Sequence, residues 1–542
     1  MNTWLQHLPV LPIVVPLITG ALLLLFAETR RRPRLLITLF ATLTQLAVAV
    51  TMVWLTTDSV PETWPRGIGV YAIGGWKAPF GIVLVVDRLS ALMIAVNVTL
   101  ALAVTLYSIG RWDRMGVHYH SLLQFLLMGL NGAFLTGDLF NLFVFFEVLL
   151  AASYALLLHG GGSQRTRMAL HFVAVNLTAT FAFLIGIAMI YSVAGTLNMA
   201  EIAWKWRLMS PDERGIAQVG AAILGIAFLV KAAAWPLNFW LPGAYHAAGA
   251  PVAAIFTITT KVGVYAILRA GSLLEDASAP FGGVWLFYLG IATMLFGIVG
   301  MLASRQLPRL VAFVVILSSG TILAAVGSGA SSMIAPALYY MLGSVFATAA
   351  FFMLAGMAER MRSALPDHGD RAATPPTYTA FAVGEPPDPY APDDEVGVAL
   401  PAAMAFLGLA FVFCALLVTG MPPLAGFIAK FSLAAAAIDA LPATGGPGRD
   451  WLFIVVLLTG GLAGLLALMR VGMRLFWSVT GRQTPRLSIT EAGPVALLIL
   501  VCLAITIAAG PTMTYLDSAA ANLADPELYI QSVLQHSHEV AR

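Results

Sequence analysis

Long apolar runs recur along nearly the whole chain, with short polar loops between them. A run of about 20 residues can cross roughly 30 Å of hydrocarbon as a helix whose backbone hydrogen bonds are satisfied internally. The pattern therefore predicts an all-α polytopic membrane protein. We expect fourteen transmembrane helices, over residues 8–27, 35–56, 83–107, 121–137, 138–158, 167–194, 216–247, 250–273, 281–303, 309–328, 332–358, 398–437, 451–476 and 489–514.

Composition supports a membrane protein. Hydrophobic residues make up 59% of the 542 positions and charged residues only 10%, against about 25% charged residues in soluble domains. The first run has no basic segment before it and no small-residue cleavage site after it, which favours a retained helix over a signal peptide. No basic stripe indicates nucleic acid. Cys414 and Cys502 both fall in apolar runs, as buried free thiols do.

The basic residues predict an orientation. Seventeen of the 29 Lys and Arg residues fall on one side if the amino terminus is outside, in the loops 30–34, 111–114, 165–167, 305–309, 360–371 and 470–486. Cytoplasmic loops carry such an excess, so both termini are predicted to lie outside. Residues 363–397 are rich in Pro, Asp and Glu. They predict an irregular cytoplasmic insertion, for which a solvated loop is favoured and a partner-docking role stays the alternative.

Four ionisable residues fall near the middle of predicted helices, namely Glu147, Lys231, Lys261 and Lys430. An ammonium at a helix centre costs roughly 2.5–3.5 kcal/mol even on a lenient insertion scale, so it persists only where it faces a bundle interior or a wet cavity. Lysine can exchange its proton when buried, whereas arginine stays charged. We therefore expect a proton path. A buried Glu147–Lys231 ion pair that only fixes packing remains the alternative.

Two predicted helices are interrupted by proline, at Pro236 and at Pro422-Pro423, and each carries a lysine beside its break. Broken helices 7 and 12 in corresponding positions of two halves indicate two inverted five-helix repeats with the ion path at the breaks. The predicted organisation is helices 1–3 over 1–120, a first repeat of helices 4–8 over 121–273, a second repeat of helices 9–13 over 281–476, and helix 14 with an external tail over 489–542.

Several polar residues on the same helices are weaker relay candidates, because each is also common as a packing residue. They are His171, Asn176, His246, Thr259, Thr260, Ser318 and Ser319. The chain has no phosphate-cradling loop, no dinucleotide fingerprint and no metal-spaced His/Cys set. We therefore expect no cofactor and no metal site, and a secondary-active ion transporter rather than an enzyme.

Four segments of the chain resemble those of a known family. They are GDLFNLFVFFEVLLAASYALL, KAAAWPLNFWLP, TTKVGVYAILR and GMPPLAGFIAKF. They are similar to the proton-translocating, antiporter-like subunits shared by respiratory complex I and the Mrp multisubunit cation/proton antiporters. The resemblance covers essentially the whole chain. The strings DLFNLFVFFEVL and GTLNMAEIA most resemble the D-subunit family of the Mrp antiporters, also called Pha or Mnh.

This resemblance implies sodium/proton or potassium/proton exchange in a bacterial inner membrane, in a complex with A-, B-, C-, E-, F- and G-type subunits. It implies a paired gate at Glu147 and Lys231, a central relay at Lys261 and a terminal proton site at Lys430. In the predicted helix 309–328, Ser318 lies near the position of a family histidine. We therefore expect the passage from Lys261 to Lys430 to lack hydroxyls and imidazole and to need ordered water.

Two other functions stay open at this point. The same lysines would serve a proton-pumping membrane-arm subunit of a quinone- or hydrogenase-linked redox complex, where electron transfer elsewhere supplies the energy. They would also suit a non-conducting scaffold that keeps buried charges for packing and assembly. No all-oxygen cation cage is legible in the chain, so the cation site is expected in a partner or at an interface.

Overall fold

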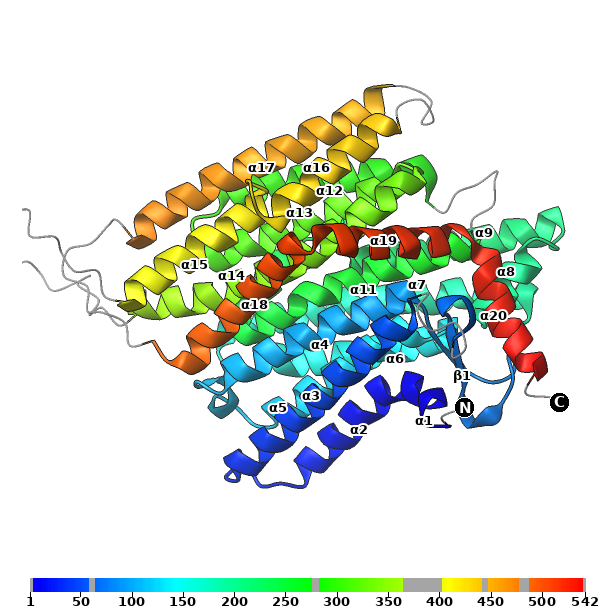
Figure 1. The fold of residues 1–542 in the computed structure, drawn as a ribbon, viewed down its shortest axis with the longest axis horizontal. Coiled ribbons are helices and arrows are strands. Elements are labelled where there is room, and N and C mark those ends of the chain that lie inside the picture. The colour runs from blue at the N-terminus through cyan, green and yellow to red at the C-terminus, as the bar shows by residue number, and fades with distance from the viewer. Residues whose placement is uncertain are drawn as a thin grey trace, which may run out of the picture.

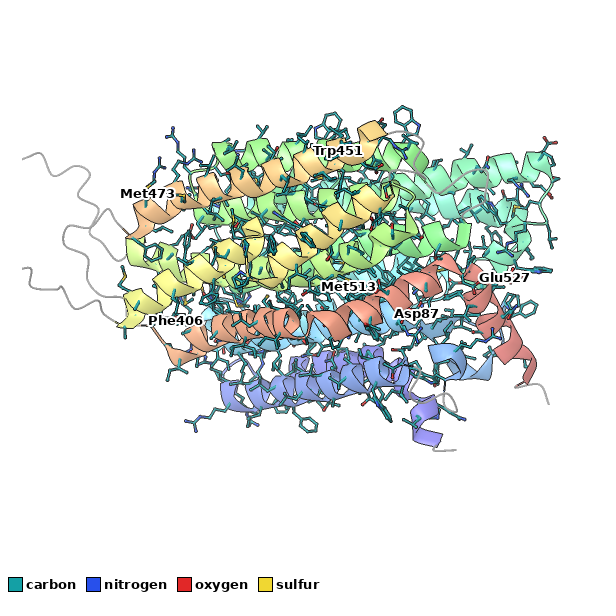
Figure 2. The ribbon with its side chains drawn as sticks, turned by 45° about the horizontal axis from the view of Figure 1, so that its top comes forward. Asp87, Phe406, Trp451, Met473, Met513 and Glu527 are labelled. Carbon is teal, nitrogen blue, oxygen red and sulfur yellow. The ribbon has the colours of Figure 1, made fainter. Side chains whose placement is uncertain are left out.

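The computed structural model describes residues 3–57, 64–274, 282–363, 402–440, 447–476 and 487–539. Most of these residues form helices packed side by side, and both chain ends lie at the same end of the bundle (Figure 1). Side chains at the two ends are labelled in Figure 2, with Asp87 and Glu527 toward one end and Phe406 and Met473 at the other. The predicted all-α polytopic fold is confirmed, apart from one small hairpin.

The first part of the chain combines helices with this hairpin. Its elements are α1 (Thr3–Gln6), η1 (Leu8–Val10), α2 (Leu11–Leu24), α3 (Arg31–Leu55), β1 (Gly69–Ala72), β2 (Val83–Val86) and α4 (Arg88–Ser108). The two strands pair antiparallel. The predicted span 83–107 is therefore wrong over its first residues. A valine-rich run forms the strand, and the helix begins where the Asp87 side chain accepts a hydrogen bond from the backbone of Ser90.

The middle of the chain holds the first broken helix. Its elements are α5 (Tyr119–Leu135), α6 (Leu139–Leu158), α7 (Ser163–Ala194), α8 (Met199–Trp206), α9 (Pro211–Lys231), α10 (Trp240–Ala247) and α11 (Ala250–Leu274). The predicted broken span 216–247 thus consists of α9 and α10. Pro236 lies in the gap between them, where its missing amide donor interrupts no helical hydrogen bond.

The last part of the chain holds the second broken helix. Its elements are α12 (Gly283–Ala303), α13 (Leu307–Gly327), α14 (Ile334–Ser363), α15 (Ala402–Thr419), α16 (Ala425–Asp439), α17 (Pro447–Phe476), α18 (Ile489–Ile507), α19 (Ala509–Ala524) and α20 (Pro526–Glu539). The predicted break in 398–437 falls between α15 and α16. The predicted insertion 363–397 lies outside the described residues, apart from Ser363.

The last predicted span is shorter than expected, because α18 ends at Ile507 rather than near residue 514. Pro511 lies four residues beyond Ile507, and its ring would clash with the carbonyl of that residue in a continuous helix. The chain instead turns at Ala508 into α19, and α20 follows at a sharp angle (Figure 1). The tail after the last predicted span is therefore largely helical, as α19 and α20.

Twelve of the described helices are long and apolar enough to cross a membrane. The two other predicted spans correspond to α2, with 14 residues, and α5, with 17 residues, so every predicted span contains a helix. The core lies around α11, α13 and α14, which are buried along most of their length and pack on one another. The two inverted repeats stay a prediction. The central helices carry Lys261 and its partners, and helices packed around them carry the other charged residues of the predicted path.

Candidate functional site

Glu147 lies at the middle of α6 and is only partly buried. Its carboxylate accepts a hydrogen bond from the hydroxyl of Thr180 on α7, with an oxygen–oxygen distance of 2.6 Å. Hydrogen bonds to a charged group are the strong ones, so this contact fixes the carboxylate's position. Sequence reasoning missed Thr180. The signal was available, because Thr180 lies one helical turn beyond the relay candidate Asn176.

Lys231 is the last residue of α9, and its ammonium lies 5.5 Å from the ring centroid of Phe146. The negative face of an aromatic ring attracts such a cation. Because Phe146 directly precedes Glu147, the amine and the carboxylate lie on adjoining elements. No ion pair joins the two in the part of the chain that the structure describes. Their role as a paired gate stays a prediction.

The backbone after Lys231 is shaped by tight packing. Ala233 has a positive φ of 56°, which is uncommon for a residue with a side chain. The helix α11 packs directly against this break through Gly263, where an added Cβ would lie 2.8 Å from the carbonyl carbon of Lys231. Glycine is therefore required for this approach, and it brings α11 against the end of α9.

Lys261 lies at the middle of α11. Its ammonium donates to the hydroxyl oxygens of Ser318 and Ser319 on α13, at 3.0 and 3.1 Å. Ser318 in turn donates to the hydroxyl of Ser344 on α14, at 2.8 Å. The expectation that the passage beyond Lys261 lacks hydroxyls is therefore wrong. The sequence analysis named Ser318 and Ser319 but missed Ser344, because only the packing of α14 on α13 brings it there.

Lys430 lies on α16 and reaches back across the second break. Its ammonium donates to the backbone carbonyl of Thr419, the last residue of α15, at 2.7 Å. The C-terminal end of a helix carries partial negative charge, which favours a cation there. Gly461 on α17 leaves room for this contact, because an added Cβ would lie 3.2 Å from the ammonium.

Of the weaker relay candidates, one contacts a lysine and the others do not. Ser318 contacts Lys261 directly. Thr260 is buried and donates to the carbonyl of Thr257 in its own helix, and His171 is exposed on α7 with its ring against Phe239. His246 lies partly buried on α10. No hydrogen bond or ion pair links these last three to the lysines among the described residues.

The buried charge of Arg269 is paired with a carboxylate, unlike the charges of the three lysines. Arg269, eight residues beyond Lys261 on α11, forms a buried ion pair with Asp87 at 2.6 Å. By contrast, Lys231, Lys261 and Lys430 are 8%, 1% and 7% exposed, and within the described chain none of them has a carboxylate within ion-pair distance. The lysines are held by a ring, by hydroxyls and by a carbonyl instead. Such partners bind an ammonium without neutralising it.

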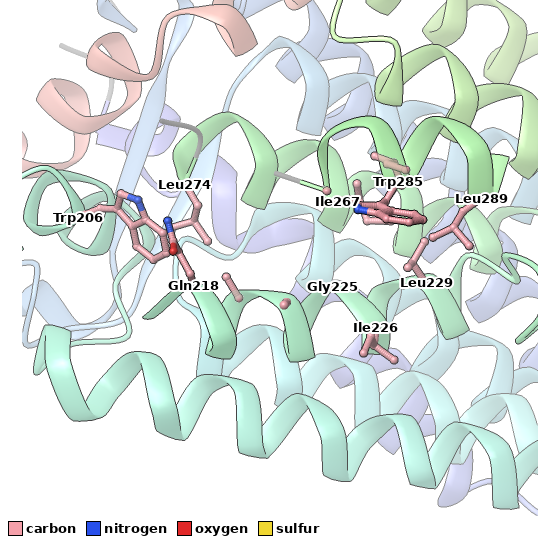
Figure 3. A pocket seen from close by; sticks show the side chains of 13 residues that line it. Trp206, Gln218, Gly225, Ile226, Leu229, Ile267, Leu274, Trp285 and Leu289 are labelled. Carbon is pink, nitrogen blue, oxygen red and sulfur yellow. The ribbon is translucent and has the colours of Figure 1, made fainter. Parts of the chain in front are cut away.

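A cavity of about 410 Å³ between α9, α11 and α12 lies apart from these residues (Figure 3). Its lining is mostly apolar, with Trp206 and Gln218 toward one end and Trp285 and Leu289 toward the other. None of the three lysines lines it. The three lysines therefore lie in the packed interior, away from this cavity.

Comparisons with known proteins identify the relatives of this chain. Residues 136–372 match the family model described as NADH:quinone oxidoreductase/Mrp antiporter, TM. The D subunit of a probable K(+)/H(+) antiporter from Rhizobium meliloti is 46% identical over 98% of both chains. The D subunit of the Na(+)/H(+) antiporter from Alkalihalophilus pseudofirmus is 33% identical over 98% of this chain and 100% of its own length.

Solved structures show the same fold. A chain of the Mrp complex from Dietzia superposes with a TM-score of 0.80 at 26% identity, over 98% of this chain and 100% of that one. A chain of respiratory complex I from Thermus thermophilus superposes with a TM-score of 0.72 at 21% identity, over 96% and 100%, which shows the fold alone. The chain belongs to the D-subunit family of the Mrp antiporters and is one component of a multisubunit cation/proton antiporter.

Proposed function

We propose that this subunit carries protons across the membrane along Glu147, Lys231, Lys261 and Lys430, in exchange for a monovalent cation. One observation carries the proposal. Three lysines are buried in the helical interior, and in the described chain none of them pairs with a carboxylate. A buried ammonium without a counter-ion is costly, so its retention points to a function rather than to packing.

The contacts support a relay in which each amine takes and releases a proton. Glu147 receives the proton and holds the first lysine electrostatically without a direct bond. The hydroxyls of Ser318 and Ser344 extend the contacts of Lys261 from α13 to α14. Because α14 packs against α16, which carries Lys430, the remaining step to the terminal site is across one helix interface. Ordered water would complete it.

The relatives support the exchange partner and the subunit's surroundings. The Rhizobium meliloti relative is named for potassium and the Alkalihalophilus pseudofirmus relative for sodium, so we infer that the cation is one of these two. We infer partners of the A, B, C, E, F and G types, and a bacterial inner membrane with both termini outside. The two inverted repeats, residues 121–273 and 281–476, would place the two breaks at equivalent depths.

Exchange in vesicles tests the proposal. The whole antiporter is expressed with Lys430→Gln in this subunit, and sodium- or potassium-dependent proton movement is followed with a pH-sensitive dye. Lys205→Gln is the matched control, because Lys205 lies near the surface and pairs with Glu201 at 3.0 Å. We expect exchange to be lost in the first variant and kept in the second. Normal exchange by an assembled Lys430→Gln complex would refute the relay.

The same vesicles separate the two remaining functions. A component of a redox complex would move protons when a quinone or hydrogenase substrate is supplied, without an added cation gradient. An antiporter component would need the cation gradient and would ignore the electron donor. A scaffold would assemble and leave exchange unchanged when its buried lysines are replaced. The names of the relatives favour the antiporter.

A further inference from the structure

Two threonines outside the proposed proton path contact the backbone of the two helix breaks. Thr293 on α12 accepts a hydrogen bond from the amide of Trp235, with a nitrogen–oxygen distance of 2.8 Å. Thr506 on α18 accepts one from the amide of Ala425, at 2.9 Å. The helices α12 and α18 carry none of the four proposed relay residues. Each break is therefore held by a side chain that belongs to a different helix.

The first break needs this contact because its other amides bond to the backbone and this one does not. Within residues 232–237, four amides donate to backbone carbonyls, namely those of Ala232, Ala233, Ala234 and Leu237. Pro236 has no amide hydrogen. An amide at membrane depth has no water to bond, and an unpaired donor there is costly. Thr293, which is 0% exposed, therefore completes the hydrogen bonding of the first break.

The second break needs its threonine at the start of α16. The first amides of a helix have no partner within that helix. Leu424, the residue before α16, provides no side-chain cap. Thr506 therefore caps α16 from a neighbouring helix, through the amide of Ala425. Because Lys430 lies five residues farther along α16, the position of its amine depends on where the start of this helix is held.

Each of the two hydroxyls is oriented by its own helix. Thr293 donates its hydrogen to the carbonyl of Leu289 at 2.6 Å, and Thr506 donates to the carbonyl of Cys502 at 2.8 Å. With the hydrogen bonded to the helix, only the lone pairs of the oxygen remain for the break, and they accept from the amide. These hydroxyls therefore hold the backbone and do not pass a proton to it.

We propose that Thr293 and Thr506 are positioning residues for proton transfer, each holding one break in the shape that places its lysine. This inference rests on the proposed proton path. Trp235 follows Lys231 by four residues, and Lys430 donates across the second break at 2.7 Å. Transfer between such groups slows when either is displaced. Each threonine lies on the first helix after a predicted repeat, so both breaks are held in the same way.

Exchange by the whole antiporter tests the proposal. Thr293→Val and Thr506→Val keep the shape of the side chain and remove the acceptor, whereas Thr293→Ser and Thr506→Ser keep the hydroxyl. The amount of assembled complex is measured after purification, and proton exchange in vesicles is followed against the cation concentration. Thr105→Val is the matched control, because Thr105 is 0% exposed and donates to the carbonyl of Ala101 in its own helix at 2.8 Å. Lys430→Gln is measured in the same vesicles.

We expect each valine variant to exchange about tenfold more slowly per assembled complex, because an amide of the break loses its partner. The cation concentration that gives half the maximal rate should not change, since the hydroxyls contact backbone. Both serine variants and Thr105→Val should exchange at nearly the parent rate.

Three results would overturn the inference. One is a lower yield of complex with normal exchange per complex, because the threonines would then only stabilise the fold. The others are equal slowing of the serine and valine variants, and equal slowing of Thr105→Val. If Thr293→Val does not assemble, Thr506→Val decides alone. Normal exchange by Lys430→Gln would instead refute the proton path, and a loss in that variant beside normal valine variants would refute only the positioning role.

Discussion

Replacing Lys261 by methionine separates a functional lysine from a structural one, because α11 carries its own comparison. Arg269 lies eight residues farther along the same helix and is also buried. It pairs with Asp87 at 2.6 Å, whereas Lys261 contacts only the hydroxyls of α13. Lys261→Met and Arg269→Met therefore remove one buried cation each from the same helix, with and without a carboxylate partner.

The contacts set the expected magnitudes. Arg269→Met leaves a buried carboxylate unpaired, which costs about 3–5 kcal/mol of unfolding free energy. Lys261→Met loses two hydrogen bonds from a charged donor, each worth about 1.5–3 kcal/mol. It also removes an ammonium whose insertion costs roughly 2.5–3.5 kcal/mol. The two bonds together are worth about 3–6 kcal/mol and the insertion term offsets about 2.5–3.5 kcal/mol of this, so we expect Lys261→Met to lose about 1.5 kcal/mol of unfolding free energy.

The assay combines unfolding in detergent, followed by intrinsic fluorescence against denaturant, with cation-dependent proton exchange in vesicles. Lys261→Met should unfold near the parent midpoint but lose exchange. Arg269→Met should unfold at a clearly lower denaturant concentration. The reasoning fails if Lys261→Met is destabilised as strongly as Arg269→Met, because Lys261 would then hold the helices together. It also fails if Lys261→Met keeps normal exchange.

Three further changes test single contacts. Thr180→Val removes the donor to Glu147 and should slow exchange about tenfold, since a hydrogen bond to a charged group is worth about 1.5–3 kcal/mol. Gly461→Ala places a methyl 3.2 Å from the ammonium of Lys430 and should slow exchange severalfold, because overpacking costs about 1–3 kcal/mol. Asp113 accepts from Arg31 at 2.6 Å; burial raises the pKa of this carboxyl, but the side chains of His120 and Arg31 outweigh burial and lower it. Its stabilisation is therefore present above about pH 4 and is lost as the pH falls further. Melting temperatures of Asp113→Asn should therefore depend less on pH in that range.

Two matched variants serve as controls for the Thr180 and Gly461 substitutions. Thr178→Val changes a hydroxyl that donates to the carbonyl of Ala174 in its own helix on the exposed side of α7, and it should leave exchange unchanged. Gly408→Ala adds a methyl where no atom lies within 4 Å, and it should behave like the parent protein. If Thr178→Val slowed exchange as much as Thr180→Val, or Gly408→Ala as much as Gly461→Ala, the loss would come from a general intolerance to substitution. The contact to Glu147 or to Lys430 would then not account for the slower exchange.

The fold could be predicted largely because the membrane restricts the choices. Hydrocarbon demands helices of about 20 residues, so apolar runs predicted every span. The breaks were also predictable, because proline acts through its own backbone at Pro236 and Pro422. The run Val83–Val86 was not, since a buried strand and a buried helix share the same apolar pattern. Only pairing with Gly69–Ala72 decides between them.

The charged residues of the candidate site could be predicted from the sequence. The residues that contact them could not all be predicted. A lysine in an apolar run is conspicuous from sequence alone, as Lys261 is. Its partners are ordinary serines and threonines, which usually bond their own helix. Thr180 and Ser344 gain their roles only because α7 packs on α6 and α14 packs on α13. Spacing along one helix cannot reveal a contact made between two.

At each of the two breaks, a lysine is associated with the C-terminal end of a half-helix. Lys231 is the last residue of the half-helix that precedes its break, whereas Lys430 belongs to the half-helix that follows and donates back to Thr419. The Lys430 amine therefore lies at the C-terminal end of a half-helix, and Lys231 is itself the last residue of one, with its ammonium over the ring of Phe146. The unpaired carbonyls at such helix ends carry partial negative charge. This charge steadies an ammonium without the permanent hold of a carboxylate. An amine so placed can lose its proton when a neighbouring charge moves, which the Asp87-bound Arg269 cannot.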